Sequence, residues 1–254
     1  MGDYVLHIEL DDAVIANASS DTLCIARKVN NAYTVIFASG SVVPKKPEIK
    51  RMTDHSKFEW KDKYQVFFAA KYKAGLLVWA VISRGTHQEG GIKYGQIVKY
   101  DSKEGKLNPA TGQGDNSGSF TVTGSPGGEF RVAVEFEANG VWTPIFVDHE
   151  PRQGDPTTVL TPKHEYALYW SNSSETTSMI AKTRTPSYTI SFGEEESSKT
   201  LRYGYTAKDQ KDGNEQFNWY EYSTSVFFVV LHVVVLQVVQ LFASFDTLFK
   251  LRMT

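Results

Sequence analysis

The stretch of sequence that decides the fold is Phe130–Asp148, which reads FRVAVEFEANGVWTPIFVD. Apolar residues alternate with charged or small ones over Phe130–Glu137, and the mostly apolar run Val141–Val147 follows Asn139-Gly140, a dipeptide that favours the tight turn of a β-hairpin. Because successive side chains of a strand point to opposite faces, this pattern predicts two antiparallel strands joined by a short turn.

The same period of two recurs along the chain, for example in Tyr4–Leu10, Tyr33–Phe37 and Tyr64–Phe68. Turn-forming residues such as Asn30-Asn31 and Gly90-Gly91 lie between these runs. No helix of about ten residues or more is expected before the C-terminal tail. The sequence therefore predicts an all-β protein with a sandwich or elongated antiparallel β architecture, ending in an apolar C-terminal helix or strand.

Loop composition suggests where the chain divides. Asp101–Gly118 is rich in Lys, Gly, Asn and Asp and is either a surface loop or a boundary between β units. We expect an N-terminal β unit over residues 1–100, a second β unit over 101–222 and an apolar tail over 223–254.

Charge and cysteine content exclude several classes of protein. The 254 residues hold 27 Lys and Arg against 29 Asp and Glu, a net charge of −2 that argues against a nucleic-acid partner. A single cysteine, Cys24, excludes an intramolecular disulfide and fits a reducing compartment. The N-terminus lacks the basic and apolar regions of a signal peptide, so we expect a protein that is cytoplasmic at synthesis, with later membrane association or release left open.

Catalytic and metal-binding patterns are absent from the sequence. No nucleophile elbow, phosphate loop or dinucleotide fingerprint occurs, and the six histidines show no metal-ligand spacing. His149 and His164 each adjoin acidic residues, but neighbours on a strand point to opposite faces, and we expect both to be loop histidines. We therefore predict no enzyme activity, no cofactor and no metal site.

The first segment that suggests a function is Ser117–Glu137, where two alternating runs flank the glycine-rich turn Gly124–Gly128. The pattern predicts a two-faced hairpin. It fits a strand pair that inserts into a membrane barrel, and it fits equally a hairpin that covers a sandwich core. The residues that would insert are Phe120, Val122, Phe130, Val132, Val134 and Phe136.

A second segment, Ser171–Phe192, is dense in Ser and Thr. Its alternation is compatible with pore formation, with an exposed sheet face and with a sugar-binding surface. Exposed aromatic side chains are a further resource for sugar or interface contacts. The candidates are Trp142, Trp170, Trp219 and Tyr220.

The tail is the third segment, since Val226–Phe245 is almost entirely apolar and long enough to cross a bilayer as a helix. Three interpretations stay open. The tail is a membrane anchor, or it is a segment removed or rearranged before the protein acts, or it is a buried helix or strand or even an extension that comes from a wrong gene model.

Taken together, the segments Ser117–Glu137 and Ser171–Phe192 and a separable C-terminal segment give a chain that resembles the pore-forming cytolysins of fungal fruit bodies, of the flammutoxin type. The resemblance implies a non-enzymatic, membrane-active protein that oligomerises with copies of itself and inserts an amphipathic hairpin, with membrane lipid or a cell-surface glycan as its partner. The alternatives are a carbohydrate-binding, lectin-like module and a tail-anchored cytosolic β domain.

Overall fold

The computed structural model describes residues 2–17, 20–70, 72–78, 81–84, 91–151, 154, 156–172, 174–180, 188–205 and 217–221. Met1–Tyr220 forms one compact unit and Glu221–Thr254 forms another. The expected apolar tail over 223–254 lies outside the described residues. None of the helices described is both long and apolar enough to cross a lipid bilayer.

The prediction of an all-β fold is confirmed. The largest sheet in the described part of the chain has the strand order β11-β10-β5-β1-β15-β16, with β6 also paired to β5. Strand β1 is antiparallel to β5 and parallel to β15, so this sheet is mixed. Its strands are β1 (Asp3–Leu10), β5 (His55–Ala69), β6 (Val81–Arg84), β10 (Arg131–Ala138), β11 (Val141–Val147), β15 (Ser198–Gly204) and β16 (Asn218–Glu221).

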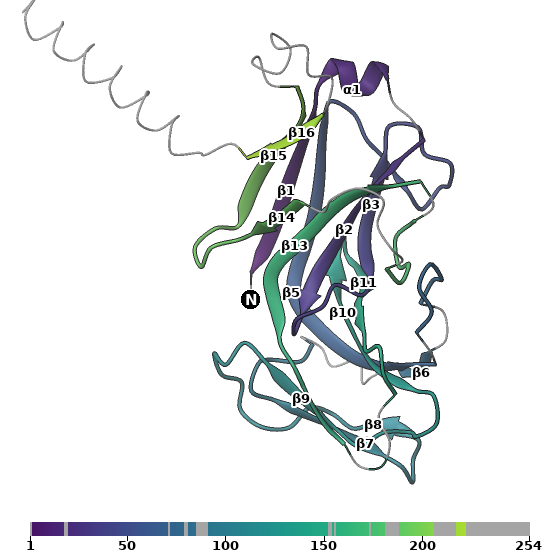
Figure 1. The fold of residues 1–254 in the computed structure, drawn as a ribbon. Helices are drawn as coiled ribbons and strands as arrows, with labels where there is room; N and C mark the ends of the chain where they lie inside the picture. Colours follow the sequence, from purple (N-terminus) through teal and green to yellow (C-terminus); the bar gives the residue numbers. More distant parts are fainter. Residues whose placement is uncertain are drawn as a thin grey trace, which may run out of the picture. The chain divides into compact units, whose positions relative to one another are not determined.

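A second sheet packs across the core from the first, as Figure 1 shows. Its described strands have the order β14-β13-β2-β3-β4. The only helix among the described residues is the five-residue α1 (Asp12–Ala16), which follows β1. The strands of this sheet are β2 (Thr22–Val29), β3 (Ile36–Ser41), β4 (Lys50–Arg51), β13 (Pro162–Ser171) and β14 (Tyr188–Ser191).

A smaller sheet lies at one end of this sandwich, toward the bottom of Figure 1. Its described strands have the order β12-β9-β7-β8, and β7 and β9 are parallel. Phe120 of β9 lies with its ring 5.9 Å from that of Tyr64 of β5, so the small sheet contacts the end of the large one. The strands are β7 (Ile97–Asp101), β8 (Lys106–Leu107), β9 (Phe120–Thr123) and β12 (Thr157–Leu160).

Strand β5 shows how the sequence builds the sandwich. Over its first half, exposed and buried residues alternate strictly, with Phe58 and Trp60 on the buried face, and the buried Tyr64 continues this face. Opposite them lie charged side chains that face solvent, such as Lys57 and Glu59. A strand with this pattern is stable only when its apolar face is covered by a second layer.

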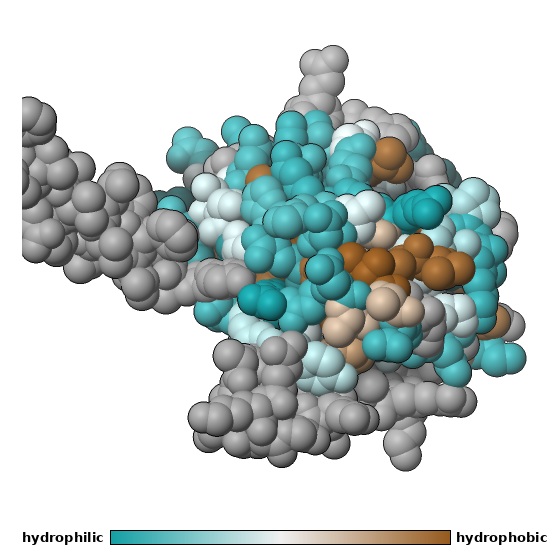
Figure 2. Space-filling view, turned by 90° about the horizontal axis from the view of Figure 1, so that it is seen from above, coloured by the Kyte–Doolittle hydropathy of each residue, from teal (hydrophilic) through white to brown (hydrophobic). Residues whose placement is uncertain are grey.

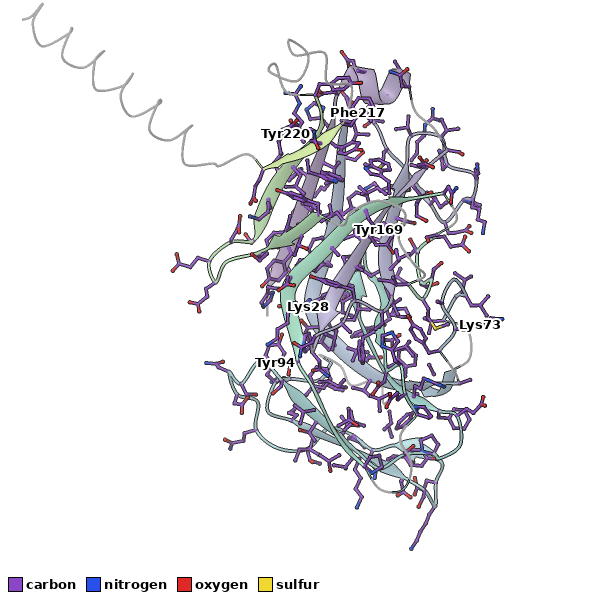
Figure 3. All side chains as sticks on the ribbon, viewed as in Figure 1. Lys28, Lys73, Tyr94, Tyr169, Phe217 and Tyr220 are labelled. Carbon is purple, nitrogen blue, oxygen red and sulfur yellow. The ribbon has the colours of Figure 1, made fainter. Side chains whose placement is uncertain are left out.

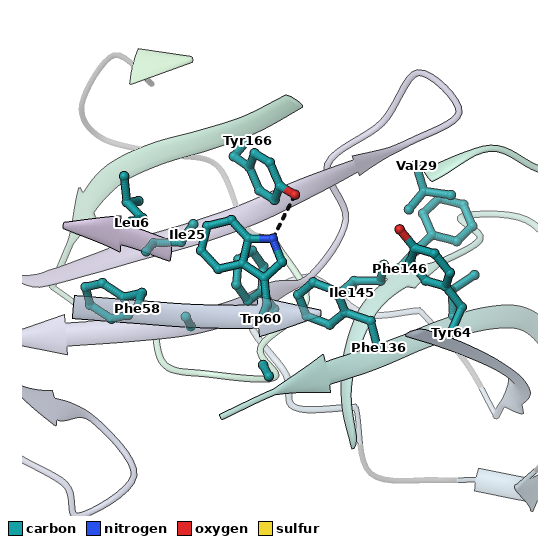
Figure 4. Close-up of a cluster of buried hydrophobic side chains, with 14 of the residues drawn as sticks. Leu6, Ile25, Val29, Phe58, Trp60, Tyr64, Phe136, Ile145, Phe146 and Tyr166 are labelled. Carbon is teal, nitrogen blue, oxygen red and sulfur yellow. Dashed lines mark hydrogen bonds between the residues drawn. The ribbon is translucent and has the colours of Figure 1, made fainter. Parts of the chain in front are cut away.

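The core is rich in aromatic rings that come from both large sheets (Figure 4). Phe37 of β3 packs edge-on against Trp60 of β5 and Phe136 of β10, at ring-centre distances of 5.4 and 4.9 Å. The indole Nε1 of Trp60 donates a hydrogen bond of 2.9 Å to the hydroxyl of Tyr166 in β13. This bond satisfies the polar atoms of two buried rings and ties the sheets together.

The predicted hairpin turn at Asn139-Gly140 is confirmed. Strands β10 and β11 pair directly across it, and both turn residues have positive φ, 50° for Asn139 and 77° for Gly140. Two left-handed residues in a two-residue loop match the twist of the flanking strands.

The expected boundary near residue 100 does not divide the described fold, because strands from both expected units share the large sheet. β1 pairs with β15 and β5 pairs with β10, and the whole segment Met1–Tyr220 is one compact unit.

In Figure 2 the described surface seen from above is mostly hydrophilic, with a band of hydrophobic residues near its centre.

Candidate ligand-binding cleft

The described residues form a cleft of about 740 Å³ where the long sheets meet the loops around the small sheet. We call it the Asp62 cleft, after the buried carboxylate that lines it. Figure 3 shows one lining residue, Tyr94, between β13 and the small sheet. The lining residues are Gly2, Tyr4, Asp62, Tyr64, Ile92, Lys93, Tyr94, Gly114, Asp115, Asn116, His164 and Glu194.

Backbone contacts fix the loop that carries Tyr94. The amide of Ile92 donates a bond of 2.7 Å to the carbonyl of Tyr64, which attaches the loop to β5. Gly91 has φ of 72°, and a Cβ there would lie 2.7 Å from the same carbonyl oxygen, so the approach requires glycine. The amide of Asp115 in turn bonds to the carbonyl of Tyr94 at 2.8 Å, which brings the second lining loop alongside.

At the base of the cleft, Asp62 is paired with a fully buried arginine. Nη1 of Arg27 lies 2.6 Å from Oδ1 of Asp62, and Nε of Arg27 donates to the carbonyl of Lys163 at 2.8 Å. Burial alone would lower the pKa of Arg27, but the neighbouring Tyr166, Tyr64 and Asp62 raise it overall, so the guanidinium stays charged. Asp62 is 7 % exposed, so the pair is shielded from solvent and held by direct contact.

Two tyrosine hydroxyls extend from this carboxylate toward the cleft. Tyr64 donates to Oδ1 of Asp62 at 2.6 Å, and Tyr94 donates to the hydroxyl of Tyr64 at 3.1 Å. Burial is the main cause of the raised pKa of both phenols. Both therefore remain protonated at neutral pH and act as the donors of these two hydrogen bonds.

His164 and Tyr4 complete the polar wall. Nε2 of His164 lies 3.5 Å from Oδ2 of Asp62, and its ring centre is 5.2 Å from that of Tyr4. Burial lowers the pKa of His164 in spite of the nearby carboxylate, so the ring is neutral at pH 7. Burial and Asp62 raise the pKa of Tyr4 to about 12. This wall of the cleft thus combines aromatic rings with neutral hydrogen-bonding groups around one compensated ion pair.

Comparison of the chain with protein-family models, with curated proteins and with solved structures finds no match. Among the described residues, no three His, Cys, Asp or Glu side chains come together in a group that could hold a metal ion.

The expected hairpin over Ser117–Glu137 is wrong as a pair of strands. β9 pairs with β12 and β7, whereas β10 pairs with β5 and β11, so the two runs belong to different sheets. Their apolar side chains pack into the core, with Phe130 partly buried against it and the other five buried, namely Phe120, Val122, Val132, Val134 and Phe136.

The aromatic residues proposed for sugar contact do not share one site. Trp142 lies on the outer face of the large sheet, with Nζ of Lys63 5.3 Å from its ring centre. Trp170 and Trp219 stack at 6.4 Å in a cluster of half-buried rings beside β15. Tyr220 follows Trp219 in β16 and is half-buried. None of the four lines the Asp62 cleft.

For two of the cleft residues, Asp62 and His164, the sequence contained a signal that could have indicated their position. Asp62 occupies an inward position of β5, in phase with Trp60 and Tyr64, and a carboxylate on an apolar face signals a buried partner. His164 is a strand residue of β13 and not the loop histidine we expected. Its neighbour Glu165 points the other way, to Lys28 and Tyr33, as the alternation of strand side chains requires.

Proposed function

We propose that this protein binds a carbohydrate in the Asp62 cleft and acts as a lectin-like recognition module without turning its ligand over. The observation that carries the proposal is the combination of tyrosine rings with a buried carboxylate and a neutral imidazole in one cleft. A volume of about 740 Å³ lies in the range of small-ligand sites.

The chemistry of the lining fits a sugar. Sugar rings present apolar C–H faces and polar hydroxyl edges, and Tyr4 and Tyr94 offer ring surface because both are only partly buried. Asp62, His164 and the tyrosine hydroxyls supply fixed hydrogen-bonding groups beside those rings. Because these groups are held by the fold, little ordering is needed when a ligand binds.

Glycan-array screening followed by calorimetry tests the proposal. We expect Tyr94→Ala to weaken sugar binding at least about tenfold, because a half-buried aromatic contact and a hydroxyl are both lost. Trp142→Ala is the matched control, since it removes an aromatic ring outside the cleft and should leave affinity unchanged. A wild-type chain that binds no glycan contradicts the function, and loss of binding in the Trp142 variant alone contradicts the site.

Membrane activity by the segment Ser117–Glu137 stays a prediction. Insertion requires its apolar side chains to leave the core, since five of the six are buried. Dye release from lipid vesicles measures this activity, and comparison of the full chain with one that ends at Tyr222 isolates the contribution of the tail. Leakage by either chain adds membrane attack to sugar binding.

A further inference from the structure

The hydrogen atoms of the cleft have a fixed direction. A phenol carries one hydroxyl hydrogen, and Tyr64 commits its own to Oδ1 of Asp62, because a carboxylate only accepts. The bond of 3.1 Å between the two tyrosine hydroxyls must then use the hydrogen of Tyr94. The oxygen of Tyr94 consequently has only lone pairs left for a ligand.

The carboxylate of Asp62, behind these tyrosines, likewise has no hydrogen to donate. Oδ1 of Asp62 accepts from Arg27 and Tyr64, and Oδ2 faces Nε2 of His164 at 3.5 Å. The side chain of Tyr4 also hydrogen-bonds to this carboxylate. Arg27 is fully buried and is not a lining residue, so its positive charge neutralises that of Asp62 behind the wall of the cleft. Donors from the protein thus occupy Asp62, and what this wall leaves for a ligand is acceptor lone pairs, foremost those of Tyr94.

The charged side chains that line the cleft also favour a ligand with hydrogen-bond donors and a positive charge. Asp115 and Glu194 line the cleft with one cation, Lys93, among the described lining residues. His164 adds no charge at neutral pH, since burial lowers its pKa. The lining thus has more carboxylates than cations, and ring faces that attract a cation lie beside them.

We propose that the ligand of the Asp62 cleft is an amino sugar, whose primary ammonium group supplies donors to these acceptors. The inference rests on the proposed sugar binding and names its ligand class. An ammonium group has three donors and no acceptor, which complements Tyr94 and the carboxylates. A uronic acid or a sulfated sugar would place acceptors against acceptors and is rejected.

Calorimetric titration with three oligosaccharides of equal length tests the ligand class. The probes are a glucosamine oligosaccharide, its uncharged N-acetylated form and a hexuronic acid oligosaccharide. We expect the glucosamine form to bind about three- to tenfold more tightly than the N-acetylated one, and the uronic form most weakly. Equal or tighter binding of the N-acetylated form overturns the inference and leaves sugar binding intact, whereas no binding of any probe overturns the proposed function itself.

A variant of the hydrogen-bond chain tests its direction. Tyr64→Phe removes the acceptor of the Tyr94 hydrogen, which becomes free to donate to a ligand, while Arg27 still contacts Asp62. We call the ratio of the dissociation constants of the uronic and glucosamine probes the penalty against the uronic probe, and we expect this ratio to fall at least about threefold in Tyr64→Phe. Tyr166→Phe is the matched control, because its hydroxyl pairs with Trp60 outside the cleft. A penalty that is unchanged in Tyr64→Phe overturns the inference.

Should Tyr64→Phe fail to fold, Tyr94→Phe gives an independent measurement. It deletes the acceptor oxygen on a residue that is only partly buried. The preference for the glucosamine probe over the N-acetylated probe is expected to fall. A preference that persists undiminished contradicts the role of Tyr94 and with it the inference.

Discussion

Arg27 and Asp62 form a buried ion pair whose two charges depend on each other. Removing one partner leaves an uncompensated charge in the core, so we expect Asp62→Ala to lower the free energy of unfolding by about 3–5 kcal/mol. Replacing both residues by apolar ones, Arg27→Met with Asp62→Leu, removes the unpaired charge and should recover part of that loss. Urea denaturation followed by tryptophan fluorescence measures both variants.

An exposed ion pair serves as the control for this measurement. Lys57 and Glu59 lie 2.7 Å apart on the solvent face of β5, where water screens their attraction. Glu59→Gln should therefore leave the denaturation midpoint unchanged. A loss in Asp62→Ala no larger than in Glu59→Gln would contradict the importance of the buried pair.

His164 makes stability depend on pH. Burial lowers its pKa in the folded state below the ordinary value near 6.5, so the unfolded chain binds the proton more readily. The contribution of His164 is fully present above about pH 6.5 and is lost as the pH falls through its lowered folded-state pKa. We expect the difference in unfolding free energy between wild type and His164→Gln to shrink between pH 7.5 and pH 5. A difference that is independent of pH would show that burial of this ring does not bias its protonation.

At the scale of single residues, the sequence pattern could identify some residues of the cleft and not others. Asp62 lies two residues before the predicted strand run Tyr64–Phe68 and in phase with Tyr64, so extending that run by one step would place a carboxylate on its apolar face. Arg27 and Tyr94 carry no such signal, because Arg27 meets its partner 35 positions away and Tyr94 meets Tyr64 30 positions away. Alternation tells which face a side chain takes, but not which distant side chain it will meet there.

The hairpin of β10 and β11 depends on a turn with two left-handed residues. Gly140 has φ of 77°, and a Cβ at this position would meet no atom within 4 Å, so only backbone conformation opposes a substitution. We expect Gly140→Val to cost about 1–2 kcal/mol of stability. Asn139→Gly, which relieves the left-handed backbone strain at position 139 itself, is expected to be close to neutral. Thermal unfolding of both variants checks this, and equal losses would contradict a conformational cause.

At the scale of elements, strands connected by short turns could be predicted and strand partners could not. Because Asn139-Gly140 is a two-residue turn, the strands on either side of it, β10 and β11, must pair with each other. The looser segment Gly124–Gly128 lets β9 leave β10 and pair instead with β12 and β7. Both arrangements bury Val122 and Val134, so the hydrophobic pattern is the same for either.

For the whole molecule, membrane insertion and the described fold compete for the same strands. If Ser117–Glu137 inserts as a hairpin, β9 must first separate from β12. Thr123 of β9 lies directly opposite Thr157 of β12, and neither side chain is buried, so a cysteine pair at these positions can lock the two strands without disturbing the core. The native Cys24 is buried and does not compete for the bond.

The variant Thr123→Cys with Thr157→Cys therefore separates the two proposed activities. We expect its oxidised form to bind sugar as tightly as the wild type, because neither residue lines the Asp62 cleft. Any dye release shown by the wild type should be lost on oxidation and return with a reducing agent, since insertion requires β9 to move. Release that persists in the oxidised form excludes the hairpin as the inserting element. Loss of sugar binding on oxidation would instead mean that the cleft must open at the small sheet, which contradicts a site already formed in the folded chain.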